Sequence, residues 1–93
     1  MISSVKQSFG KHVIKLLPQE KEGKYQFSGQ FVVTQNASER FHPVVIAIAH
    51  IMLQKLVKTY GGLDYLQVFE IDGQRLWFID DVTHVTCLLP EDY

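Results

Sequence analysis

Alternating apolar and polar positions predict the strands in the first part of the chain. A first strand is predicted over residues 11–17 and ends at Pro18, which marks a break in regular structure. A second is predicted over residues 24–34, where apolar and mostly polar side chains alternate with the period of two of a half-buried strand. Gly29 falls in the apolar register of this strand, so a bulge or a large neighbouring side chain is expected there.

A long apolar stretch after a connection over residues 34–41 predicts a helix. Pro43 suits the first helical turn, where its missing N–H costs nothing, and the Gly61-Gly62 pair is a strong stop signal. The apolar arc of this helix is wider than that of a usual surface helix. We therefore expect it to be deeply seated, or covered on a second side by the N-terminal segment or by another chain. Its polar positions fall on one narrow stripe of His50, Gln54 and Lys58.

Two strands joined by Asp72-Gly73 are predicted after the helix. Asp-Gly favours the type I′ turn of a two-residue hairpin, which places Val68 opposite Trp77 and Glu70 opposite Arg75. Successive side chains of a strand point to opposite faces of the sheet. One face is therefore expected to carry Tyr65, Phe69, Ile71, Leu76 and Phe78. The other, the Trp77 face, is expected to carry Leu66, Val68, Glu70, Arg75, Trp77 and Ile79.

A last strand is predicted over residues 82–89, after a two-residue turn at Asp80-Asp81. This turn pairs Trp77 with His84 and places His84 and Thr86 on the Trp77 face. A three-residue loop would reverse the assignment, but apolar residues at 85, 87 and 89 favour the shorter turn. The 93 residues predict one α+β domain, a mostly antiparallel sheet of four to five strands with one long helix packed on one face.

The Trp77 face lacks a partner among these elements. An apolar centre inside a polar rim is the usual layout of a protein interface, and Trp is enriched among the residues that dominate binding energy. Three interpretations stay open: residues 2–9 fold over this patch, the patch is an interface with a second copy or another protein, or it is a small-molecule site. The predicted interface consists of Trp77, Leu66, Val68 and Ile79 in the centre and Glu70, Arg75 and His84 at the rim.

Charge is unevenly distributed along the chain, although the net charge is only −1. Residues 1–63 hold eight Lys or Arg and three Asp or Glu, whereas residues 64–93 hold one Arg and seven Asp or Glu. The two halves either neutralise each other within the fold or leave a basic and an acidic patch that would orient a partner. Nucleic acid is not an expected partner, because acidic residues surround Trp77 and no aromatic-basic motif accompanies the lysines.

No group of residues has the spacing of a catalytic or metal site. His84 and Cys87 lie three apart on a predicted strand and so point to opposite faces, and the four histidines lack metal-ligand spacing. His50 is expected to be solvated on the polar stripe of the helix, and Cys87 to be an inert core residue. We therefore expect no enzyme, no cofactor and no metal.

The expected location is cytoplasmic. The N-terminus has no apolar leader, and a single cysteine fits a reducing compartment. The longest apolar run, residues 44–53, is too short to span a membrane, so no membrane partner is expected.

The stretch FVVTQN, the apolar helix after it and the stretch LDYLQVFEI together resemble a small domain-of-unknown-function family of low-GC Gram-positive bacteria and their phages. The matching span is about residues 30–71, and its most specific piece is residues 63–70; the first thirty residues and the ending depart from the family pattern. The resemblance implies no activity, but it implies a bacterial or phage accessory protein of mobile-element origin.

These observations favour a non-catalytic protein-interaction module that self-associates as a homodimer, through the Trp77 face or the wide helix. A sharper hypothesis is a phage or mobile-element protein that inhibits a host defence protein by occluding it, as an anti-CRISPR protein does. The alternative is a small-molecule-binding or enzymatic homodimer with a site between its subunits.

Overall fold

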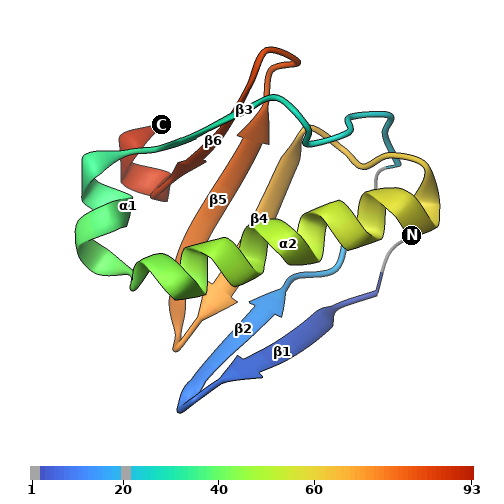
Figure 1. Ribbon diagram of the computed structural model, residues 1–93. Coiled ribbons are helices and arrows are strands. Elements are labelled where there is room, and N and C mark those ends of the chain that lie inside the picture. Colours follow the sequence, from blue (N-terminus) through green and yellow to red (C-terminus); the bar gives the residue numbers. More distant parts are fainter. Residues whose placement is uncertain (1–2, 20–21) are drawn as a thin grey trace.

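The protein consists of one sheet with a long helix across it (Figure 1). The computed structural model describes residues 3–19 and 22–93. Its strands follow the order β1-β2-β4-β5-β6-β3 across the sheet, and every neighbouring pair is antiparallel except β3 with β6. This confirms the α+β class, with six strands in the sheet. The elements are β1 (Val5–Phe9), β2 (His12–Leu16), β3 (Gln30–Val33), α1 (Gln35–Arg40), α2 (Pro43–Tyr60), β4 (Leu66–Ile71), β5 (Gln74–Asp80), β6 (His84–Leu88) and the 3-10 turn η1 (Pro90–Asp92).

Helix α2 begins and ends where its sequence signals predict. Pro43 is its first residue, and Gly61 closes it with φ of 80°, a conformation that glycine adopts without steric cost. The helix crosses one face of the sheet (Figure 1). Val44 and Ile51 stay exposed on its outer side, so the N-terminal segment does not cover them. The residues that it buries are Val45, Ile46, Ala49, Met52, Leu53 and Val57.

The hairpin of β4 and β5 has the predicted register. Asp72 and Gly73 have φ of 51° and 82°, the positive values that a type I′ turn requires. Glu70 and Arg75 lie opposite each other and form an exposed ion pair at 3.5 Å. Such an exposed cross-strand pair contributes at most about 1 kcal/mol, so the hairpin depends mainly on its turn and on burial of its apolar face.

The turn between β5 and β6 differs from the prediction. Strand β5 continues through Asp80, and Val82 and Thr83 form the turn, so Trp77 lies opposite Leu88 and not opposite His84. The pairing moves by an even number of residues, so the faces stay as predicted, with Val85 and Cys87 buried and His84 and Thr86 half-buried on the Trp77 face.

Asp80 explains this displacement of the turn. Its side chain is buried and accepts hydrogen bonds from the N–H of Phe27 at 2.8 Å and of Val82 at 2.7 Å. Burial of this carboxylate is tolerated because both donors satisfy it. Asp80 is therefore the buried last residue of β5 and not part of an exposed loop.

The segment over residues 24–34 is strand only at Gln30–Val33, where β3 pairs with β6. Phe27 is buried but has φ of 50°, which is incompatible with a regular strand. Gly29 allows close approach of two backbones, since a Cβ atom there would lie 2.7 Å from the carbonyl oxygen of Thr83. The expected bulge or large neighbouring side chain is thus replaced by contact with the β5–β6 turn.

The N-terminal segment forms an edge strand. Residues 5–9 form β1, which pairs with β2 through a turn at Gly10, whose φ is 57°. They therefore extend the sheet and do not fold over Trp77; Ile2, which belonged to that interpretation, lies outside the described residues. The expected connection over residues 34–41 contains α1, which Thr34 caps by accepting a hydrogen bond from the N–H of Ala37 at 3.2 Å.

Candidate functional site

The face of the sheet opposite α2, which we call the open face, carries the predicted interface centre. Val68 lies opposite Trp77 and Leu66 opposite Ile79, and all four side chains are half-buried. None of them belongs to the cluster that packs under α2. Within residues 3–19 and 22–93, α2 and α1 do not cover this face (Figure 1). The four apolar residues therefore form one contiguous, partly solvated patch at the middle of the sheet.

A row of charged side chains crosses the open face at one end of this patch. Lys6 of β1 lies opposite Lys15 of β2, which lies opposite Glu70 of β4, which lies opposite Arg75 of β5. Adjacent strands are about 4.8 Å apart, so these side chains lie close to one another on the face, and Glu70 and Arg75 form the ion pair described above. The structure thus confirms that Glu70 and Arg75 share a face with Trp77, and it adds two lysines that sequence reasoning had not placed there.

His84 lies at the rim as predicted, but at the other end of the sheet from the charged row. It is half-buried, follows the β5–β6 turn and is in register with Gln30 of β3. Its Nδ1 atom lies 2.9 Å from the hydroxyl of Thr83. Gln30, Val32 and Thr86 lie on the open face near this end too, with Val32 opposite Thr86.

Tyr93 joins the patch, although nothing in the pattern of the sequence predicted it. Its ring lies 5.7 Å from that of Trp77 and is tilted by 64°, an edge-to-face arrangement that is favourable for aromatic pairs. The side chain is 79% exposed, so it lies beside Trp77 without enclosing it. The half-buried ring of Trp77 and the exposed ring of Tyr93 form an aromatic pair on the open face.

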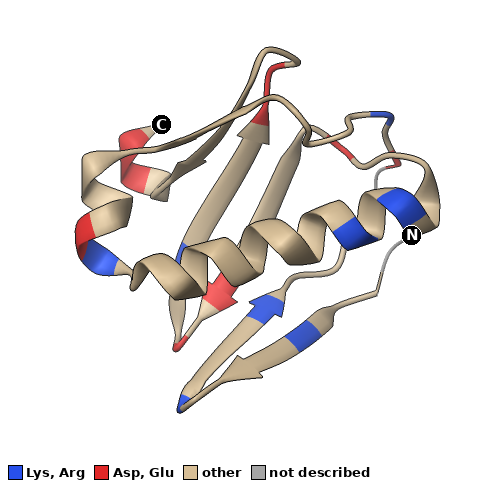
Figure 2. Cartoon of the chain, in the orientation of Figure 1, with Lys and Arg blue, Asp and Glu red and all other residues tan. Residues whose placement is uncertain are grey.

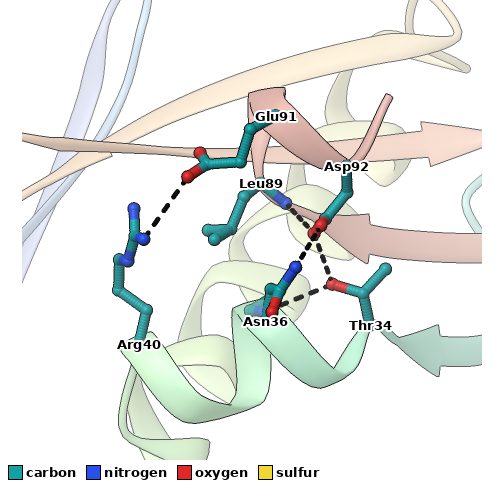
Figure 3. Close-up of polar contacts among 7 residues, drawn as sticks. Thr34, Asn36, Arg40, Leu89, Glu91 and Asp92 are labelled. Carbon is teal, nitrogen blue, oxygen red and sulfur yellow. Dashed lines mark hydrogen bonds and ion pairs between the residues drawn. The ribbon is translucent and has the colours of Figure 1, made fainter.

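A hydrogen-bond network positions η1 and hence Tyr93 (Figure 3). The carboxylate of Asp92 accepts hydrogen bonds from the Asn36 amide at 2.7 Å, the Thr34 hydroxyl at 2.8 Å and the Leu89 N–H at 3.0 Å. These bonds, that from Asn36 first, lower the pKa of Asp92. They tie the end of the chain to the first turn of α1, two segments that are distant in sequence.

Cys87 is the core residue that the sequence predicts. It is fully buried, and burial raises the pKa of its thiol to about 12, so it carries no thiolate for nucleophilic chemistry. His84 points to the opposite face of the same strand. Among the described residues, no group of three or more His, Cys, Asp or Glu side chains could hold a metal ion.

His50 contradicts the expectation of a solvated position. Its ring stacks on Phe31 with centroids 4.2 Å apart and planes within 7°, and its Nε2 atom is buried without a hydrogen-bond partner. Burial lowers the pKa of His50, and the backbone of Phe27 opposes this shift. The cause is β3, which lies at the edge of the sheet and brings Phe31 against this side of α2; the helical pattern alone could not reveal that neighbour.

Because its pKa is lowered in the folded protein, His50 is expected to make stability depend on pH. The unfolded chain binds the proton near the ordinary pKa of about 6.5, whereas the folded protein binds it only at lower pH. The free energy of unfolding should therefore fall as pH falls from about 7 to about 5. Denaturant titrations across this range should give a flatter profile for His50→Phe, which keeps the stacking but cannot ionise. An unchanged profile would contradict this assignment.

Among the described residues, several cavities lie outside the open face, including one of about 450 Å³ between α2 and the segment before β3, which is lined by Gln26, Phe27, Ser28, Gln54, Val57 and Lys58. A groove of about 270 Å³ between β3, α1 and α2 is lined almost entirely by apolar atoms, so it offers little to orient a polar ligand. A smaller cavity of about 60 Å³ lies beside His12, whose Nδ1 atom is 2.6 Å from Asp72. The apolar groove between β3, α1 and α2 is lined by Phe31, Val33, Ser38, Pro43, Ile46 and Ala47.

Comparison of the chain with models of protein families, with curated proteins and with solved structures found no match. Within the described part of the chain, no helix is both long enough and apolar enough to cross a membrane.

Proposed function

We propose that this protein is a non-catalytic protein-binding module that docks through the open face of its sheet. The observation that carries the proposal is the partly solvated apolar patch around Trp77, surrounded by charged and polar side chains. Contiguous apolar patches at a protein surface, especially those with a polar rim, often mark interaction sites. The patch has the layout of an interface, with an apolar centre and a polar rim.

Trp77 is the side chain from which the largest binding contribution is expected. A Trp buries about 150–250 Å² when it is covered completely, and residues of this type dominate binding energy when they lie near the centre of an interface. Its position on β5, with Val68 on one side and Leu88 on the other, gives it a rigid backbone support. A preformed site of this kind loses little conformational entropy on binding.

Truncation of Trp77 tests the proposal. Trp77→Ala should weaken binding of the protein's physiological partner, whether a second copy or another protein, by roughly 30-fold or more, which is the effect of a residue that dominates binding. Tyr60→Ala is the matched control, because it removes an aromatic ring that is 54% exposed at the far end of α2. Association can be measured by sedimentation velocity, and other partners by quantitative recovery from the native cell.

The proposal requires at least one partner that Trp77→Ala loses and Tyr60→Ala retains. If both variants behave like the wild-type protein in self-association and in every recovered complex, the open face is not a docking surface.

We further propose that the cellular role is inhibition of a host defence protein by occlusion, as a phage or mobile-element accessory protein. The role is motivated by the resemblance that the stretches within residues 30–71 suggest to a family found in phages, and a preformed sheet face suits the blocking of a partner's surface. Expression of the protein should then raise the plating efficiency of a phage only on hosts with the active defence system, and Trp77→Ala should remove the effect. Equal plating with and without the protein on all such hosts would contradict it.

A further inference from the structure

We infer that the open face binds a second copy of this chain, packed face to face with its strands running in the same direction, so that β1 and β2 of each protomer lie over β3 and β6, with the adjoining η1, of the other. This inference rests on the proposed function of the open face and adds the identity and orientation of the partner. Two features of the structure lead to it, the size of the apolar patch and the arrangement of charge across the sheet.

The apolar patch is too small to form an interface alone. A stable interface buries about 800 Å² on each partner. Six strands about 4.8 Å apart, each about five residues long, give a sheet of roughly 24 by 17 Å, and Leu66, Val68, Trp77 and Ile79 occupy its two middle strands. A partner that covers this patch with enough area must therefore extend over both edges of the sheet.

The two sides of the sheet carry opposite charge (Figure 2). Residues 3–19, which form the β1–β2 side, contain three lysines and no Asp or Glu. Residues 81–93, which form the β6–η1 side, contain three acidic residues and no Lys or Arg. On that second side the exposed pair of Arg40 and Glu91, 3.4 Å apart, reduces the acidity locally, and Glu39 on the same helix α1 offsets Arg40. The uneven charge of the sequence therefore survives as a polarity across the sheet.

A two-fold interface is self-complementary, so this polarity selects one orientation. If the axis runs parallel to the strands, the basic side of each copy lies over the acidic side of the other. If the axis runs across the strands, basic lies over basic and acidic over acidic, and like-charge contacts of this kind cost binding energy. The first orientation also matches the aligned packing of two sheets at about −30°.

The middle of the charged row is consistent with the same orientation. In the order β1-β2-β4-β5-β6-β3 the middle of the sheet lies between β4 and β5, so the two-fold axis passes between Glu70 and Arg75, which are register partners. Rotation about this axis places Glu70 of each copy over Arg75 of the other. It also places both Trp77 rings next to the axis, at the centre of the interface, where the residues that dominate binding energy usually lie.

Charge reversal at these two positions tests the inference. Glu70→Arg and Arg75→Glu should each weaken self-association by about tenfold or more, because each places like charges against each other across the axis. An equimolar mixture of the two variants should recover wild-type affinity as a heterodimer. In that heterodimer the two reversed side chains attract each other across the axis, and so do the native Arg75 of one chain and the native Glu70 of the other. Lys58→Glu, an exposed charge change on α2, is the control and should leave association unchanged. Sedimentation velocity gives the dissociation constants, and circular dichroism checks that every variant is folded.

Recovery in the mixture supports the orientation, because a merely structural effect of either substitution would persist there. A wild-type protein that stays monomeric at millimolar concentration, or a dimer that the reversals do not weaken, overturns the inference. So does a mixture that remains dissociated. If the protein is monomeric but still loses another protein partner on Trp77→Ala, this inference fails and the proposed function stands; if neither occurs, both fail.

Discussion

Replacing Phe78 by alanine is expected to lower the free energy of unfolding by about 3–5 kcal/mol. Phe78 is fully buried on the strand at the middle of the core, beneath α2. Its ring packs edge-to-face against Phe69 with centroids 5.3 Å apart and stacks on Phe31 at 6.0 Å. Alanine removes the ring from this aromatic cluster and leaves a cavity that neighbours on three elements cannot close, so both burial and dispersion contacts are lost.

This loss is large relative to the total free energy of unfolding of the domain. A domain of this length has a total stability of roughly 5–14 kcal/mol, so the substitution should remove between about a fifth and all of it. Urea titrations followed by far-ultraviolet circular dichroism provide the measurement. Tyr60→Ala removes a ring of similar size from an exposed site and should change stability by less than about 1 kcal/mol. Equal effects of the two substitutions would show that the core around Phe78 is packed differently.

Gly62→Ala is the second substitution with a large expected effect, a loss of about 3 kcal/mol or more. Gly62 has φ of 151°, a conformation that L side chains rarely adopt. A Cβ atom there would also lie 2.6 Å from the Cα atom of Lys24 and 2.8 Å from its carbonyl carbon. Both obstacles are backbone atoms, so no side-chain rotation relieves the contact. The substitution would push apart the bridge between Tyr25 and Leu63, which ties the end of α2 to the loop before β3.

The adjacent glycine is a matched control for this experiment. Gly61 also has positive φ, 80°, but a Cβ atom there would meet nothing within 4 Å. Gly61→Ala should therefore lower the free energy of unfolding by only about 1–2 kcal/mol, the cost of placing an L residue in the left-handed conformation. The difference between the two variants, measured by denaturant titration, isolates the close approach of the two backbones. A smaller loss for Gly62→Ala than for Gly61→Ala would contradict the described path of residues 23–25.

Local signals predicted the parts of the fold that depend on neighbours in sequence. Asp72-Gly73 determined the β4–β5 register, and Pro43 with Gly61 determined both ends of α2, because each acts through its own backbone geometry. The assignment of Trp77 and Phe78 to opposite faces followed from the alternation of strands and was confirmed. The apolar centre of the candidate site was therefore predictable residue by residue.

The elements that sequence reasoning missed depend on contacts between distant segments. Strand β1 has no alternating apolar pattern, since most of its side chains are exposed, and it exists because β2 offers it a partner. The position of the β5–β6 turn was predicted wrongly because the Asp80 carboxylate accepts a hydrogen bond from the N–H of Phe27. Phe27 precedes α2 in the chain, whereas Asp80 follows it, so local sequence does not reveal this contact. His50 is desolvated by Phe31 for the same kind of reason. The local conformational preferences of these residues do not reveal contacts with segments that are distant in sequence.

The parallel pairing of β3 with β6 has a consequence for the order in which the molecule can be completed. Gln30 is synthesised early, yet it pairs with His84, and the whole of α2 and the β4–β5 hairpin lie between them in the chain. Contacts between segments this far apart in sequence form slowly. The backbone N–H and C=O groups of β3 therefore lack strand partners until β6 has been synthesised and has folded. A chain that stopped before His84 would lack β6, so β3 would have no neighbour in the sheet. Phe31 of β3 would then no longer be held in its stack on His50.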